Sequence, residues 1–242
     1  MMRLRCTAHL DEVRPPSPAR GSAGPSWVWH GPGNVVRGLL QDTLVVPAVR
    51  AFGRPFCASA AFGLGELANP VVFVANHGSH LDAPAILAAL PASIRHRTAV
   101  AAAEDYFYRN RLLGLCMSLG VGAFPFPRQG RTGVERAAAL LADGWNVVLF
   151  PEGSRSPDGA QHLFRDGIGH LLLASDAAAV PVAIVGTQAL WPRGRALPRP
   201  GPITLRLGTP WCPGSTATPR EISTELGRQV AALASECLHD RG

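Results

Sequence analysis

Residues 71–82 read VVFVANHGSHLD, an apolar run that passes directly into a polar segment containing glycine. A second stretch, residues 147–156, has the same design and reads VVLFPEGSRS. A short apolar run bounded by turn-forming residues is typical of a buried strand, and the loop after such a strand often carries function. These two stretches therefore predict an α/β fold with polar loops at one edge of its sheet.

The rest of the chain alternates between short β-rich runs and helical stretches. The predicted strands are residues 71–75, 98–101, 121–126, 147–150, 180–185 and 203–207. The predicted helices are residues 83–90, 105–119, 131–142, 165–175 and 219–238. Because parallel strands need crossover connections, this alternation predicts a single α/β domain with a mainly parallel central sheet flanked by helices.

Three regions of different character are expected along the chain. Residues 1–26 contain prolines and small residues without a hydrophobic period, which predicts a disordered leader. Residues 27–54 carry apolar positions at helical spacing and predict an N-terminal helical segment broken near Pro47. This segment either associates with a membrane surface or packs on the core. Residues 55–242 would form the catalytic domain.

Composition limits the classes of function. Of the 242 residues, 47% are hydrophobic and 17% are charged, so the chain is too apolar for disorder. Its apolar runs are shorter than the 18 or so residues that a membrane-spanning helix needs. The 23 basic residues are all arginines, and they exceed the 17 acidic ones, which favours anionic partners. No secretory signal precedes Arg14, so a cytoplasmic location, peripheral on the cytoplasmic face of a membrane, is expected.

Several common sites are excluded by the motifs that are missing. A Walker A loop needs a lysine, and neither G-x-G-x-x-G nor H-E-x-x-H occurs. The arginines are dispersed and lack an aromatic stacking platform, so no nucleic-acid partner is expected. His77, His80 and Asp82 are of metal-ligating types, but further clustered ligands are not evident in the sequence. We expect no metal and no resident cofactor.

The loops after the strands predicted at residues 71–75, 121–126 and 147–150 should meet at one edge of the sheet, where α/β proteins bind ligands. His77 is followed five residues later by Asp82, a spacing that allows an imidazole–carboxylate pair. Such a histidine is a general base. Since G-x-S-x-G does not occur, we expect it to act on a substrate hydroxyl. The alternative for Asp82 is the N-cap of the following helix.

The other two loops offer positive charge. Arg155, with backbone N–H groups of the turn at Gly153 and Ser154, is suited to holding a phosphate. Glu152 could hold a hydroxyl or orient that arginine. Arg128 directly follows the strand predicted at residues 121–126, which places it at the same edge.

Together these segments resemble the glycerolipid acyltransferases, the lysophospholipid (1-acylglycerol-3-phosphate) acyltransferase family. Residues 76–82 resemble its N-H-x-S-x-x-D motif, and residues 150–156 its F-P-E-G-[TS]-R-S motif. Weaker similarities in the family order are found at residues 122–128, 164–167 (F-[KR]-x-G) and 180–182. The resemblance covers about residues 71–208.

The resemblance implies transfer of a fatty acyl group from acyl-CoA or acyl carrier protein to a hydroxyl of a lysophospholipid-like acceptor at a membrane surface. It implies neither a metal nor a cofactor beyond the acyl donor. His77 would be the general base and Asp82 its partner. The residues that would bind the acceptor are Arg128, Glu152, Gly153, Ser154 and Arg155, with Asn76 and Ser79 in support.

Three alternatives remain open from sequence. The same base could pass the acyl group to water, as a thioester or lipid hydrolase. The acceptor could be a specialised-metabolite alcohol rather than a glycerolipid. A non-catalytic lipid- or phosphate-binding module would use the fold without its chemistry.

Overall fold

The computed structural model describes residues 26–63, 67, 70–156, 160–175, 177–192, 194–195 and 197–239. The expected leader, residues 1–26, lies outside the described residues except for Ser26, which opens the first 3-10 turn. The description below is confined to these ranges.

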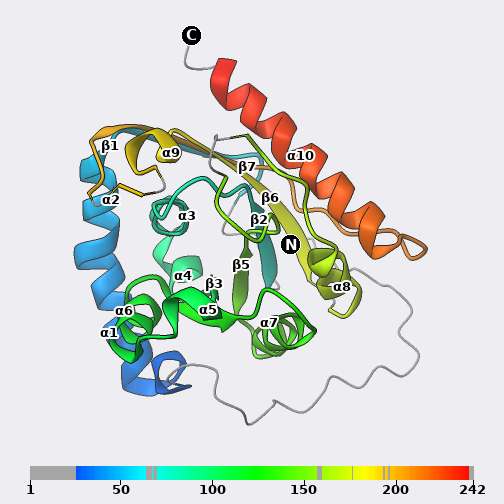
Figure 1. The fold of residues 1–242 in the computed structure, drawn as a ribbon, viewed down its shortest axis with the longest axis horizontal. Coiled ribbons are helices and arrows are strands. Elements are labelled where there is room, and N and C mark those ends of the chain that lie inside the picture. Colours follow the sequence, from blue (N-terminus) through cyan, green and yellow to red (C-terminus); the bar gives the residue numbers. More distant parts are fainter. Residues whose placement is uncertain are drawn as a thin grey trace.

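A seven-stranded sheet forms the centre of the molecule, in the order β1-β7-β6-β2-β5-β3-β4 (Figure 1). The strands are β1 (Gly53–Ala60), β2 (Val71–Ala75), β3 (Thr98–Ala103), β4 (Ala123–Phe126), β5 (Asn146–Leu149), β6 (Ala178–Val185) and β7 (Gly201–Leu207). Neighbouring strands are parallel except for the antiparallel pair β6 and β7. The predicted α/β fold with a mainly parallel sheet is confirmed.

Strand β1 was not predicted from the sequence. It lies at the edge of the sheet beside β7, and most of its residues are exposed or half-buried. An edge strand that is open to solvent needs no continuous apolar run, so the pattern that marks buried strands is missing here.

Helices cover both faces of the sheet (Figure 1). The N-terminal elements are η1 (Ser26–Trp29), α1 (Gly31–Leu40), the π-helical η2 (Gln41–Val45) and α2 (Val46–Phe52). The other helices are α3 (Asp82–Ala89), α4 (Ala92–Arg95), α5 (Glu104–Phe107), α6 (Arg111–Val121), α7 (Thr132–Ala142), α8 (Gly167–Leu173), α9 (Thr187–Leu190) and α10 (Pro219–His239). One apolar cluster packs under α2 and α3, and a second packs under α7, α8 and α10.

Two helix predictions need correction. The helix expected at residues 105–119 is two helices, α5 and α6, because Asn110 adopts an extended backbone and its side chain caps α6 by accepting bonds from Leu112 N and Leu113 N. The break expected near Pro47 takes a milder form, because the chain stays helical while the π-helical turn η2 separates α1 from α2 just before this proline. Pro47 lies in the first turn of α2, where a missing N–H is tolerated.

Strand β2 positions the polar segment that follows it. All five of its residues are buried: Val71, Phe73 and Ala75 pack on the α3 side, and Val72 and Val74 pack on the opposite side. The strand pairs with β5 on one edge and with β6 on the other. The loops that follow β2, β5 and β6 therefore start side by side at the carboxyl edge of the sheet.

Helix α1 packs with its apolar stripe turned outward. Val35, Val36 and Leu39 are exposed, whereas Arg37 and Gly38 are buried. The Arg37 guanidinium lies over the rings of Trp29 and Trp145, at 5.4 and 5.0 Å from their centroids. It donates to the carbonyls of His96 and Thr98, and burial lowers its pKa to about 10.

Gly169 of α8 allows close packing on the start of α10, and its replacement tests this contact. A Cβ at Gly169 would lie 2.1 Å from the carbonyl oxygen of Pro219, so Gly169→Ala should lower the free energy of unfolding by about 1–3 kcal/mol. Gly120→Ala in α6 is the control, because its Cβ meets nothing within 4 Å, and it should raise stability by about 0.5–1 kcal/mol. Urea unfolding followed by circular dichroism measures both. Equal stability of the two variants would contradict the packing.

Candidate active site

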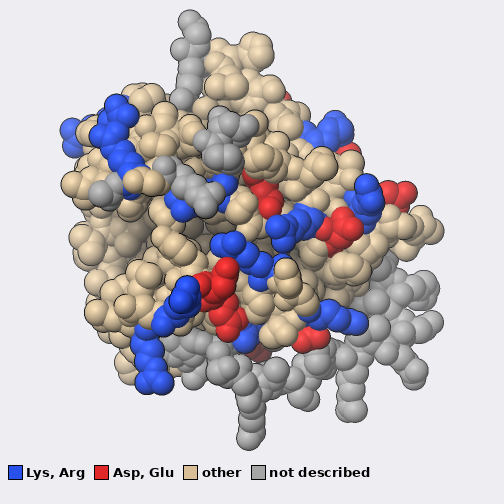
Figure 2. Space-filling model, in the orientation of Figure 1, with Lys and Arg blue, Asp and Glu red and all other residues tan. Residues whose placement is uncertain are grey.

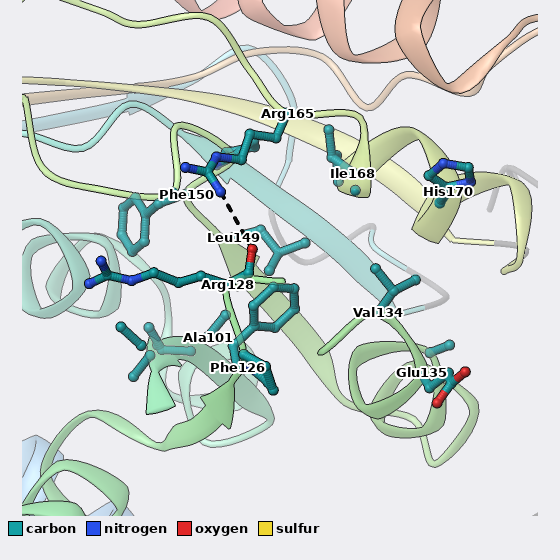
Figure 3. Close-up of a pocket in the computed structure, with 18 of the residues that line it drawn as sticks. Ala101, Phe126, Arg128, Val134, Glu135, Leu149, Phe150, Arg165, Ile168 and His170 are labelled. Carbon is teal, nitrogen blue, oxygen red and sulfur yellow. Dashed lines mark hydrogen bonds between the residues drawn. The ribbon is translucent and has the colours of Figure 1, made fainter. Parts of the chain in front are cut away.

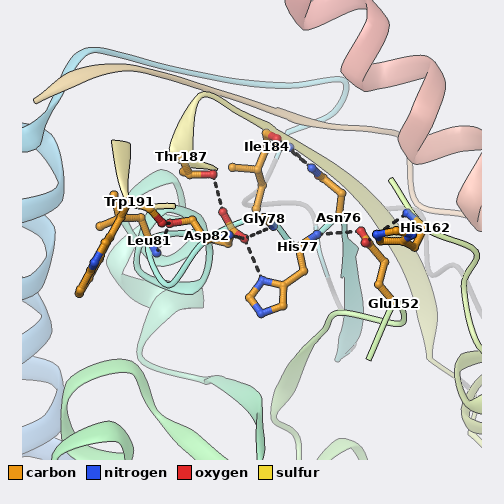
Figure 4. A network of polar contacts seen from close by, with 11 residues as sticks. Asn76, His77, Gly78, Leu81, Asp82, Glu152, His162, Ile184, Thr187 and Trp191 are labelled. Carbon is orange, nitrogen blue, oxygen red and sulfur yellow. Dashed lines mark hydrogen bonds and ion pairs between the residues drawn. The ribbon is translucent and has the colours of Figure 1, made fainter. Parts of the chain in front are cut away.

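His77 and Asp82 form a direct pair at the end of β2 (Figure 4). His77 Nδ1 lies 2.8 Å from Asp82 Oδ2. Asp82 is buried, at 1% exposure, while the His77 side chain is 21% exposed and lines a cavity. Since a carboxylate only accepts hydrogen bonds, Nδ1 carries the proton, and the Nε2 lone pair is left to act as a base.

The carboxylate of Asp82 does not cap α3, so the N-cap interpretation is wrong. Leu81 is the N-cap residue of α3, and this helix end has no side-chain capping hydrogen bond from its N-cap. Asp82 Oδ2 instead turns back and accepts from the amides of Gly78 and Ser79, each at 2.8 Å. The same oxygen that contacts His77 thus also fixes the path of the loop.

Asn76 ties this loop to the end of β6, and Ser79 ties it to the segment that follows β6. The Asn76 amide donates to Ile184 O and accepts from Ile184 N, at 2.9 and 2.8 Å (Figure 4). Ser79 Oγ donates to Trp191 O at 2.9 Å and accepts from Leu81 N at 3.2 Å. Both side chains therefore fix the position of the loop by hydrogen-bonding to backbone groups of neighbouring segments.

Glu152 has a different position from the one its motif suggests. It is 6% exposed, and its Oε1 accepts from His77 N at 2.9 Å while its Oε2 accepts from His162 N at 3.2 Å (Figure 4). Burial raises the pKa of this carboxyl, although the two amides favour the ionised form. The geometry therefore assigns Glu152 to bracing the His77 backbone, with both oxygens engaged by amides.

Arg128 and Arg165 lie close together in the wall of a cavity (Figure 3). Arg128 Nε lies 3.3 Å from Asp105 Oδ1, and the Arg165 guanidinium reaches the Arg128 carbonyl at 3.4 Å. Gly153 has φ +76°, and a Cβ there would lie 2.6 Å from Arg165 Nε. Only glycine combines this backbone with so close an approach, so the turn is shaped to bring Arg165 against it.

A cavity of about 1700 Å³ brings the histidine and the arginines together. Of the residues predicted for the site, those that line it are His77, Ser79, Arg128, Gly153, Ser154 and Arg155. Asn76, Asp82 and Glu152 lie outside the lining. The remaining walls are largely apolar and include Ala101, Phe126, Leu149 and Ile168 (Figure 3). The cavity suits a ligand with an anionic end and an apolar body.

Two contributors to the cavity were not singled out as site residues from sequence. Arg165 belongs to the segment at residues 164–167 that resembles F-[KR]-x-G, and this resemblance was the sequence signal that could have identified it. Phe150 stacks on the His77 ring, with centroids 4.2 Å apart and planes at 24°. The sequence placed Phe150 at the end of a predicted strand and at the start of the F-P-E-G-[TS]-R-S motif, but it gave this residue no role in the site. Across residues 26–63, 67, 70–156, 160–175, 177–192, 194–195 and 197–239, no group of three His, Cys, Asp or Glu side chains is placed to hold a metal.

His80 lines the cavity and is surrounded by aromatic side chains. Tyr106, Phe107 and Trp191 lie 6.1, 5.8 and 5.6 Å from its ring centroid. Burial, followed by the positive charge of Arg155 and by His77, lowers the pKa of His80 to about 4. His80 is therefore neutral at physiological pH.

The fold and the site together define an α/β protein whose paired histidine and arginine-lined cavity suit base catalysis on an anionic substrate. The Acyltransferase family model matches residues 59–185, and the chain belongs to this family.

Several curated relatives agree with this membership, and a solved structure shares the fold. The chain is 28% identical over 137 residues to a 1-acyl-sn-glycerol-3-phosphate acyltransferase of Limnanthes alba, covering 56% of this chain and 48% of the relative. It is 31% identical over 147 residues to the chloroplastic enzyme LPAT1 of Arabidopsis thaliana, covering 58% and 39%. The chain thus spans about half the length of the curated relatives it matches, or less. The 1-acyl-sn-glycerophosphate acyltransferase PlsC of Thermotoga maritima has the same fold, with TM-score 0.62, 22% identity and coverage of 87% of this chain and 90% of that one.

The lowered pKa of His80, which is half-buried, predicts a pH-dependent stability. Because its folded pKa is about 4 and its ordinary value is 6.5, the unfolded chain binds more protons between these values, and stability falls as pH drops from 6.5 to 4. The variant His80→Asn lacks this contribution. Urea titrations at pH 7 and pH 4.5 should therefore show a larger loss for the wild type than for His80→Asn. Equal losses would mean that folding does not lower the pKa of His80.

Proposed function

We propose that the protein transfers a fatty acyl group from acyl-CoA or acyl carrier protein to a hydroxyl of a lysophospholipid-like acceptor, 1-acylglycerol-3-phosphate or a related lipid. The observation that carries the proposal is the 2.8 Å His77–Asp82 pair, which opens onto a cavity shared with the arginines. Family membership and the names of the relatives support the same reaction.

In the proposed mechanism, His77 Nε2 removes the proton from the acceptor hydroxyl as its oxygen attacks the thioester carbonyl carbon. The new C–O bond gives a tetrahedral intermediate, which collapses by breaking the C–S bond. The imidazolium then returns its proton to the departing thiolate, so that the products are an ester and a thiol. Asp82 stabilises the imidazolium through Nδ1–H.

The acceptor phosphate would be held on the arginine side of the cavity. Arg128, Arg155 and Arg165 all line it, and guanidinium groups bind phosphate oxygens in a bidentate manner. Backbone amides of the turn at Gly153 and Ser154 would add further donors. Glu152 has a supporting part in this scheme, because its oxygens hold the His77 and His162 amides.

Removal of the base tests the proposal directly. His77→Ala should lower the rate of acyl transfer at least about 100-fold, the usual contribution of a general base, while the circular dichroism spectrum stays unchanged. His239→Ala, at the end of α10, is the control and should retain the wild-type rate. The assay supplies labelled acyl-CoA or acyl carrier protein with a panel of lysolipids and small alcohols, and resolves the products by mass.

The products also separate the alternatives. An esterified lysolipid supports the proposal, and an ester with another alcohol would redefine the acceptor. Free fatty acid as the only product would instead assign the site to a hydrolase. Near-normal transfer by His77→Ala would overturn the role of the base.

We propose in addition that the N-terminal helices, within residues 27–54, attach the protein to the cytoplasmic face of a membrane. The support is the reversed packing of α1 and η2, where Val35, Leu39 and Leu44 are 62%, 58% and 63% exposed while Arg37 is buried. The left flank of Figure 2, where α1 and α2 lie in Figure 1, shows mostly uncharged side chains between its ends. In the described part of the chain, none of the helices combines the length and the hydropathy needed to span a bilayer. An outward apolar stripe of this kind suits the membrane interface.

Charge placed on this stripe should release the protein from lipid. The double variant Leu39→Asp and Leu44→Asp is expected to lower binding to phosphatidylglycerol-containing vesicles at least about 10-fold. The reason is that each leucine side chain that becomes buried in the lipid contributes about 1.5–3 kcal/mol to binding. Leu238→Asp is the matched control, since this leucine is 59% exposed on α10. Vesicle flotation measures the bound fraction. Unchanged binding by the double variant would exclude this stripe as the attachment.

A further inference from the structure

The Asp82 carboxylate receives a hydrogen bond from a residue far from its own loop. Thr187, the first residue of α9, places Oγ1 2.5 Å from Asp82 Oδ1 (Figure 4). Thr187 is 2% exposed. The other oxygen, Oδ2, already contacts His77 Nδ1 and the amides of Gly78 and Ser79. Thr187 therefore donates a hydrogen bond to the Asp82 oxygen that does not contact His77.

The α9 turn is built to hold Thr187 at this place. Gly186 has φ 101°, a left-handed conformation that lets the chain turn sharply from β6 into α9. The turn also packs directly on the loop that contains His77, because a Cβ added to Gly78 would lie 3.0 Å from Gln188 Cβ. A second hydrogen bond, from Ser79 Oγ to Trp191 O, joins the two segments.

We propose that Thr187 is a positioning residue for acyl transfer, an inference that rests on the proposed function. Its hydroxyl donates to the ionised Asp82, and such O–H···O⁻ bonds are short and about twice as strong as neutral ones. It keeps the carboxylate charged and oriented toward Nδ1–H of His77. Thr187 is buried and lies outside the cavity lining, so it acts through Asp82 and His77 rather than on the substrate.

Thr187→Val tests the proposal, because it removes the hydroxyl and keeps the shape of the side chain. We expect kcat to fall about 10- to 100-fold, the usual effect of removing a group that orients a catalytic side chain, with KM unchanged. Thr187→Ser should restore most of the rate. Thr98→Val is the matched control: Thr98 is also buried and donates its hydroxyl, to Ile94 O at 2.7 Å, and its variant should keep the wild-type kcat.

The coupling between the residues gives a second test. In an Asp82→Asn background, Thr187→Val should lower kcat less than about twofold further, since the two changes remove the same arrangement. Full additivity of the two losses would overturn the proposal. Should Thr187→Val fail to fold, Thr187→Ala leaves only a small cavity and is expected to show the same loss of kcat.

A spectroscopic readout separates this inference from the proposed function. In the full-length protein labelled at histidine with ¹⁵N, the Nδ1–H proton of His77 is assigned by its loss in His77→Ala. Thr187→Val should shift this resonance, because it changes the charge and the orientation of the Asp82 carboxylate that accepts the Nδ1–H bond, whereas Thr187→Ser and Thr98→Val should leave it in place. An unchanged resonance in Thr187→Val would overturn the positioning role, even if no acyl transfer were detected. A shifted resonance in a protein without transfer activity would instead count against the proposed function alone.

Discussion

The buried carboxylate of Asp82 is the group on which the site depends. Moving an ionised carboxylate out of water costs several kcal/mol unless hydrogen bonds replace its hydration. Here the replacement is complete on both oxygens, through His77 Nδ1, two loop amides and the Thr187 hydroxyl. The donors come from the segments after β2 and β6, which are neighbours in the sheet. The order of the strands thus makes it possible to hold a charged dyad in a buried place.

The parts of this arrangement that sequence could predict are those set by local pattern. Strand β2 is buried on both sides and reads as an unbroken apolar run, and His77 and Asp82 fall within one short loop after it. Thr187 is 105 residues away from Asp82, so only the tertiary fold reveals their contact. The sequence also does not show which way the Glu152 side chain points. A motif gives the residue type at a position, but not whether the side chain faces the cavity or bonds to the backbone, as it does here.

The N-terminal helices illustrate a further limit of pattern reading. Helical period shows which residues share a face, but it does not show which face turns inward. In α1 the inward face carries Arg37, whose buried charge is compensated by backbone carbonyls and by the rings of Trp29 and Trp145. Because the face with Arg37 is turned inward, the apolar stripe of α1 is exposed. Core packing therefore describes the inward face of this helix, and the membrane association that we propose concerns the opposite face.

The motif residues divide by what they touch, and this division bears on specificity. Asn76, Asp82 and Glu152 hydrogen-bond to the backbone or to other motif residues, so they set the shape of the site whatever the substrate. His77 and the arginines line the cavity, and in the proposed reaction they would contact only the hydroxyl and the phosphate, which all phosphorylated alcohols share. The walls that would contact an acyl chain come instead from β3, β5, α7 and α8, outside the two specific motifs apart from Phe150. Chain length and acceptor preference should therefore follow the packing of these walls, which can change without altering the dyad.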